Sequence, residues 1–119
     1  MTAFNYDRMT DKGKPCVIAD FSIVPIGGGS TSIGRQVAIA VKAMAKVKGI
    51  RHQLMPMGTV LEADGLEPIL DAVKAAHEAL AEAGSLRAES TLRIDDRRDK
   101  PRSMADKVSS VERHMKQIL

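Results

Sequence analysis

Residues 16–26, CVIADFSIVPI, form a mostly apolar run in which only Asp20 and Ser22 are polar. The segment is rich in β-branched residues and Pro25 stops it, which predicts a first strand. Since neighbouring strand residues point to opposite faces, one face would be wholly apolar and the other partly polar. The apolar face would carry Val17, Ala19, Phe21 and Ile23, and the other face Ile18, Asp20, Ser22 and Val24.

Helical spacing of apolar residues follows in residues 33–49. Ile33, Val37, Val41 and Met44 recur at this spacing, and Gly49 provides a left-handed stop. The preceding loop, GGGSTS, offers hydroxyls at Ser30, Thr31 or Ser32 that we expect to cap the helix.

The second half of the chain predicts a hairpin, a helix, a strand and a last helix. Residues 51–64 are interpreted as two short strands that meet near residues 56–58, and residues 67–83 as a helix with Pro68 in its first turn and Gly84 after it. Residues 87–95 alternate as a strand, with Thr91, Arg93 and Asp95 on one face. The last helix would begin at Ser103 with Asp106 three residues on, and its apolar stripe is narrow like a helix–helix seam.

This order predicts an α+β fold, a ferredoxin-like β-α-β-β-α-β sandwich with an additional C-terminal helix. Right-handed crossovers would place both inner helices on one face of an antiparallel sheet. The other face, partly apolar, would then bind a ligand or another subunit, so we expect a homo-oligomer: a dimer or a tetramer built as a dimer of dimers.

Composition excludes several classes of protein. The chain has 119 residues, a net charge of +3 from 18 basic and 15 acidic residues, only 3% aromatic residues and one cysteine. A mixed surface without stacking aromatics argues against nucleic-acid binding, and one cysteine rules out an internal disulfide. No apolar run approaches the ~20 residues of a membrane span, so we expect a cytoplasmic protein with no membrane contact. Residues 1–15 are interpreted as a flexible N-terminal extension and residues 16–119 as a single domain.

Motifs for catalysis or metal binding have weak support. The spacing of Gly29 and Gly34 resembles a phosphate-binding loop, but Arg35 replaces its lysine, so a plain turn or a small-ligand loop is favoured. Asp95 and Asp96 would point to opposite faces, which suits salt bridges with the nearby arginines better than paired acid–base chemistry. The three histidines are scattered and Cys16 begins a strand. We therefore expect no catalytic residue, no metal and no cofactor, a hydrogen-bonded His77 and a buried Cys16.

Several sequence blocks together resemble the small thiamine-binding protein family. They are VIADFSIVPIG, the helix-opening STS, LMPMGTVLEAD, HEAL, LRIDDRRDK and KVSSVER, and they span the chain from about Val17 to its C-terminus. The resemblance implies ferredoxin-like subunits, dimers that assemble into tetramers, and non-enzymatic binding of thiamine or its hydroxymethylpyrimidine moiety for salvage, transport or sensing.

Candidate ligand-binding residues follow from the resemblance and from the chemistry of thiamine. Matching motifs carry over Met57, Gly58, Thr59, Thr31 and Ser32. A hydroxyl at Ser22 would serve the aminopyrimidine, and Asp95 or Asp20 would balance the thiazolium charge. Two alternatives stay open: a regulatory module that binds another metabolite or an anion at the Gly-Ser-Thr loop, and an assembly domain that binds no ligand.

Overall fold

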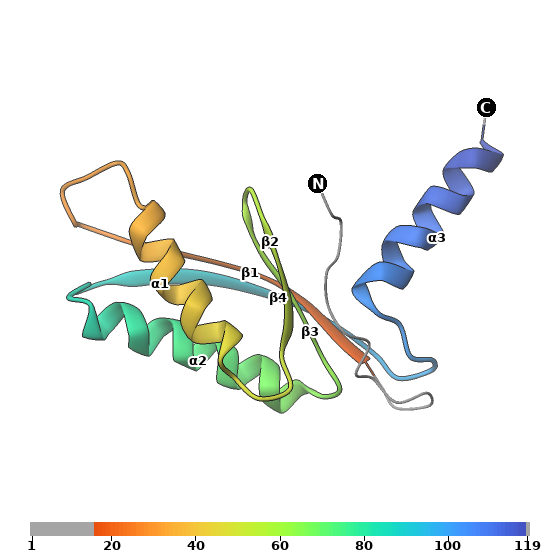
Figure 1. The fold of residues 1–119 in the computed structure, drawn as a ribbon, viewed down its shortest axis with the longest axis horizontal. Helices are drawn as coiled ribbons and strands as arrows, with labels where there is room; N and C mark the ends of the chain where they lie inside the picture. The colour runs from red at the N-terminus through yellow and green to blue at the C-terminus, as the bar shows by residue number, and fades with distance from the viewer. Residues whose placement is uncertain (1–15, 119) are drawn as a thin grey trace.

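The structure, a computed structural model, describes residues 16–118, so the expected extension at residues 1–15 lies outside the described residues. Seven elements follow one another along the chain (Figure 1): β1 (Cys16–Pro25), α1 (Gly34–Ala45), β2 (Arg51–Met55), β3 (Gly58–Ala63), α2 (Leu66–Glu82), β4 (Ala88–Arg97) and α3 (Met104–Gln117). The predicted order of elements is confirmed.

The four strands form one antiparallel sheet in the order β2-β3-β1-β4. The central strand, β1, pairs with β3 on one side and with the whole length of β4 on the other, so that Asp20 lies between Val60 and Arg93. This order places β3 between β1 and β2, as the split β-α-β arrangement requires. The ferredoxin-like α+β fold is therefore confirmed.

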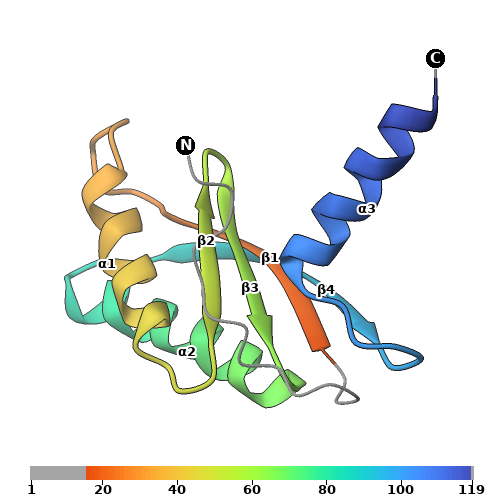
Figure 2. The same ribbon diagram turned by 45° about the vertical axis from the view of Figure 1, so that its right-hand side comes forward.

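One face of the sheet is covered by α1 and α2 (Figure 2). The four apolar β1 residues identified from the alternation are all buried there, and the buried stripes of the helices pack against them. Ala40 of α1 and Ala72 and Ala76 of α2 are fully buried, and their small side chains let the backbones approach closely. Larger side chains, Met44 and Leu80 among them, fill the rest of this core.

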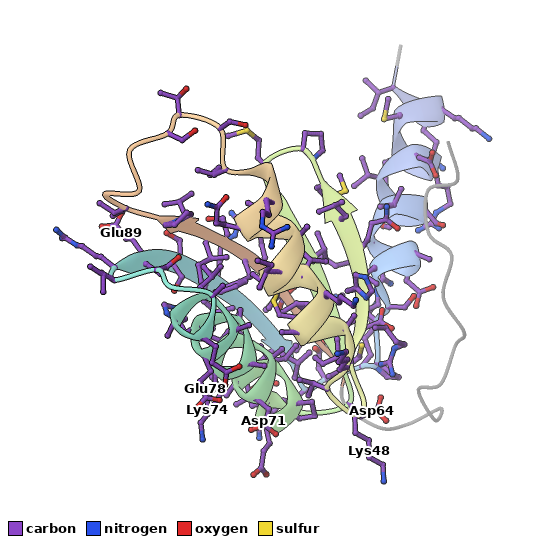
Figure 3. All side chains as sticks on the ribbon, turned by 60° about the vertical axis from the view of Figure 1, so that its left-hand side comes forward. Lys48, Asp64, Asp71, Lys74, Glu78 and Glu89 are labelled. Atoms are coloured by element: carbon purple, nitrogen blue, oxygen red, sulfur yellow. The ribbon has the colours of Figure 1, made fainter. Side chains whose placement is uncertain are left out.

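The outward surface of α2 is charged, as expected for a helix with one buried stripe. Figure 3 shows Asp71, Lys74 and Glu78 pointing from this helix away from the sheet. No helix within residues 16–118 is long and apolar enough to cross a membrane.

The start of α1 differs from the expectation. Its N-cap residue is Ile33, without a side-chain hydrogen bond, so the predicted cap by Ser30, Thr31 or Ser32 is wrong. The Ser30 hydroxyl instead accepts a hydrogen bond from the backbone N–H of Ser32 at 3.0 Å, which closes a local turn before the helix. Competition of this kind between a loop turn and a helix cap is typical of serine.

The last helix is attached to the sheet only through its first turn in the contacts that the described residues show. Ser103 caps α3 and forms the predicted capping box with Asp106. Met104 is buried against Cys16 and Ile18 on the face of the sheet opposite α1 and α2. The remaining stripe residues are exposed as α3 extends away from the sheet (Figure 2): Val108, Val111, Met115 and Ile118.

Candidate functional site

A groove of about 1050 Å³ lies on the sheet face opposite α1 and α2. We call this face the open face. Strands β1 and β4 form the floor of the groove, the β2–β3 turn forms one wall, and the first turns of α3 contribute Met104, Lys107 and Val108. The groove therefore combines the partly polar face of β1 with residues of the β2–β3 turn, of β4 and of α3.

The floor consists of two facing rows of side chains. Ile18, Asp20 and Ser22 come from β1, and the register places Asp95, Arg93 and Thr91 of β4 opposite them in that order. Directly opposed residues of an antiparallel pair point to the same face, so the period of two brings all six side chains together. The floor thus combines one apolar side chain with two carboxylates, a guanidinium and two hydroxyls.

Both carboxylates of the groove are held in ion pairs. Arg93 Nη2 donates to Asp20 Oδ2 at 3.2 Å, and Lys107 Nζ donates to Asp95 Oδ2 at 2.5 Å. The side chains of Asp20 and Asp95 are each about half exposed, at 52% and 50%. Exposed pairs of this kind contribute at most about 1 kcal/mol, so either carboxylate can change its partner at low cost.

The β2–β3 turn provides an apolar wall through Met55, Pro56 and Met57, and Met57 is 90% exposed. A thioether side chain without a fixed partner adapts readily to a flat ring. The next residue, Gly58, is required by the backbone itself, because a Cβ there would lie 2.7 Å from the carbonyl oxygen of Phe21. The glycine therefore lets the start of β3 pass close to the middle of β1, next to Asp20.

A buried carboxylate beneath the groove holds α3 in place. Glu62 is fully buried on the open face, where its Oε1 accepts from Arg51 Nε at 2.5 Å and its Oε2 accepts from the backbone N–H of Met104 at 2.6 Å. Arg51 also donates to Asp64 at 3.2 Å. This network was missed from the sequence, because charged residues in a short strand are ordinarily interpreted as solvent-facing.

Cys16 lies in the small cluster around Met104 and is buried, as expected. Burial raises the pKa of its thiol to about 11, and the negative charge of Glu62 adds to this shift. The thiol is therefore protonated at neutral pH and is a poor nucleophile.

Of the seven predicted site residues, the structure brings four into the groove: Ser22, Met57, Gly58 and Asp95. Thr59 is buried and lies opposite Phe21, which places it on the helix-covered face. Thr31 and Ser32 are exposed in the loop before α1 and do not line the groove. Arg93 and Lys107 complete the charged part of the groove. Strand alternation places Arg93 on the same face as Asp95, whereas no pattern in the sequence places Lys107 near Asp95.

A second, smaller hollow of about 320 Å³ lies at the glycine loop. Arg35 and Gln36 line it together with Gly27 and Gly28. Thr31 and Ser32 do not line this hollow either, so the loop hydroxyls and Arg35 do not converge on one site.

The charged run after Asp95 is organised as local ion pairs. Arg98 donates twice to Asp96, at 3.1 and 2.8 Å, and Arg97 donates twice to Asp99, at 2.7 and 3.0 Å. The hydrogen bond from Arg97 is the main reason why the pKa of Asp99 is lowered. The predicted salt bridging is therefore found within one chain, at the turn from β4 to α3.

Two further expectations concern the histidines and metals. His77 Nε2 lies 2.7 Å from the Ser90 hydroxyl, which confirms a packed, hydrogen-bonded histidine. Within residues 16–118, no cluster of His, Cys, Asp or Glu has the geometry to hold a metal ion.

Comparisons with known proteins agree with the resemblance seen in the sequence. The family model described as thiamine-binding protein matches residues 19–112. A UPF0045 protein of Methanothermobacter thermautotrophicus is 48% identical over 95 residues, which cover 80% of this chain and 95% of that protein. The Bacillus subtilis UPF0045 protein YqgV is 37% identical over 101 residues, covering 82% of this chain and 96% of that protein.

Among solved structures, the Methanocaldococcus jannaschii protein MJ1052 superposes with a TM-score of 0.74 at 34% identity. The match covers 82% of this chain and 96% of that one. The likeness therefore includes both the sequence blocks and the fold that supports the groove. Since the family model covers most of the described residues, the chain belongs to the thiamine-binding protein family.

Proposed function

We propose that this chain binds thiamine, or its hydroxymethylpyrimidine moiety, in the groove of the open face. The observation that carries the proposal is the convergence of an apolar methionine wall with two half-exposed carboxylates in one groove. A groove of about 1050 Å³ has ample room for a two-ring ligand.

The two rings of thiamine make different demands, and the groove offers groups for both. The aminopyrimidine needs hydrogen-bond donors and acceptors, which the hydroxyls of Ser22 and Thr91 provide on the floor. The thiazolium is a cation, and a carboxylate about 4 Å away stabilises it by about 1 to 4 kcal/mol, depending on solvent exposure. Asp95 and Asp20 are the two candidates for this role, and Met57 would cover a ring face.

The proposed function is binding without a chemical step, in salvage, transport or sensing of the ligand in the cytoplasm. Asp20 and Asp95 each have a cationic partner, which suits a counter-ion better than a general acid. The buried thiol of Cys16 and the hydrogen-bonded His77 both lie outside the groove lining.

Calorimetric titration of the full chain with thiamine and with hydroxymethylpyrimidine tests the proposal. We expect saturable binding of both ligands. Asp95→Asn should lower the affinity for thiamine about fivefold or more and leave the affinity for the uncharged pyrimidine nearly unchanged. Asp71→Asn, on the outer face of α2, is the matched control and should change neither affinity. Flat traces for both ligands would overturn the proposal.

A second candidate function, assembly, is favoured by the exposed stripe of α3. Val111 and Met115 are 59% and 65% exposed on a helix that packs against the rest of the described chain only at its start. Apolar stripes of this spacing are typical of helix–helix contacts. We therefore retain the dimer or dimer of dimers as part of the proposal, alongside ligand binding.

A further inference from the structure

The charged side chains that line the groove are two acids and two bases: Asp20, Asp95, Arg93 and Lys107. They form two separate ion pairs, so the charges that line the groove balance. Of the four, Lys107 alone comes from α3, and it reaches Asp95 from the groove wall.

We propose that the groove selects its ligand by charge and favours a zwitterion, a cationic heterocycle that carries a phosphate ester, over the plain cation. This inference rests on the proposed function and specifies its ligand class. A plain cation that pairs with Asp95 must displace Lys107, and a plain anion that pairs with Lys107 must displace Asp95. Each exchange leaves one charge of the protein without a partner.

A ligand with both charges leaves neither group unpaired. When the Lys107–Asp95 pair opens, the ring cation takes the carboxylate and the phosphate takes the ammonium, so two contacts replace one. Phosphate also accepts stronger, charge-assisted hydrogen bonds than water offers. The exchange is inexpensive because Lys107 and Asp95 are both about half exposed, at 48% and 50%.

Arg93 is a second base on the floor of the groove that can contact a phosphate. It lies two residues from Asp95 on the same face of β4, a distance of about 7 Å along a strand. Its guanidinium is 82% exposed and contacts Asp20 through one nitrogen, so the remaining donors can reach a phosphate. A cationic ring at Asp95 with a short phosphate-bearing arm therefore lies near two bases, Lys107 and Arg93.

The test is a calorimetric comparison of thiamine monophosphate with thiamine, at pH 7 and low salt, on the full chain. At this pH the monoester carries about −1.5 to −2 charges against the single positive charge of the ring. We expect the affinity for the monophosphate to exceed that for thiamine by a factor of about five or more. Lys107→Gln and Arg93→Gln should each reduce this ratio, because each removes a base that can contact the phosphate.

Lys116→Gln is the matched control, since it removes the same charge from an exposed position of α3 outside the groove lining and should keep the ratio. Thiamine binding as tight as that of the monophosphate, or a ratio unchanged in both groove variants, would overturn the charge preference alone. An absence of binding by thiamine, its monophosphate and hydroxymethylpyrimidine would overturn the proposed function together with it.

Discussion

The carboxylate of Glu62, in β3, accepts a hydrogen bond from the backbone N–H of Met104, the first residue of α3, at 2.6 Å. One fully buried side chain thus joins the sheet to the helix that bounds the groove. The same carboxylate neutralises the buried Arg51. The stability of the protein and the position of one boundary of the groove therefore depend on the same residue, which does not itself line the groove.

Glu62→Ala should be strongly destabilising. Removal of one member of a buried ion pair costs about 3 to 5 kcal/mol, and here it also leaves the Met104 N–H without its acceptor. Asp64 still pairs with Arg51, so we expect the lower end of that range. Urea unfolding at a fixed protein concentration measures the free energy, with the exposed Asp71→Ala as control. A loss below about 1 kcal/mol would contradict the anchoring role.

The Cys16 thiol should make stability fall at high pH. Its pKa is raised from 9.0 to about 11 in the folded protein. Between these values the unfolded chain loses the thiol proton while the folded chain keeps it, so unfolding is favoured as pH rises from 9 to 11. The loss approaches about 1.4 kcal/mol per pH unit.

Denaturation curves of wild type and Cys16→Ala across this range isolate the thiol from other groups that titrate there. The alanine variant starts less stable, since it leaves a small cavity, but its decline with pH should be shallower. Parallel declines would show that the thiol makes no such contribution.

Gly58→Ala should destabilise the protein by about 1 to 3 kcal/mol, because the added methyl group meets backbone rather than a movable side chain. Gly28→Ala is the matched control, since nothing lies within 4 Å of a Cβ there. Thermal unfolding of both variants measures the difference. Equal midpoints would mean that the hairpin can move away from β1 without cost.

Val111→Glu should weaken self-association, because it places a charge in the middle of the exposed apolar stripe of α3. We expect light scattering to give the mass of a dimer or tetramer for wild type and a lower mass for the variant at the same concentration. Lys116→Glu, on the same helix, changes charge outside the stripe and serves as control. A monomeric wild type at micromolar concentration would contradict the assembly prediction.

Most of the fold was predictable because its periodicities are strong. The alternation along β1 identified the buried set from Val17 to Ile23, and the Ser103–Asp106 capping box identified the start of α3. The α1 cap was not predictable, since the Ser30 hydroxyl hydrogen-bonds to both backbone groups of Ser32 within the loop instead of to the first N–H groups of the helix.

The groove was only partly predictable. Ser22 and Asp95 follow from strand alternation. Thr59 was carried over with Met57 and Gly58 from the matching PMGT motif, although Gly58 and Thr59 are adjacent strand residues and point to opposite faces. Lys107 and Glu62 required knowledge of where α3 docks. That position depends on the path of residues 98–103 rather than on any repeating pattern.

The two faces of β1 are chemically independent, since the side chains that build the helix-covered core alternate with those that form the groove floor. Substitutions at positions 20, 22, 91 and 93 can therefore alter what the groove recognises without removing a single contact from the main core. Proteins with this strand arrangement can therefore differ in the residues of the groove while they keep the same fold. Relatives with the same fold are thus best compared by the residues on the open face of β1 and β4.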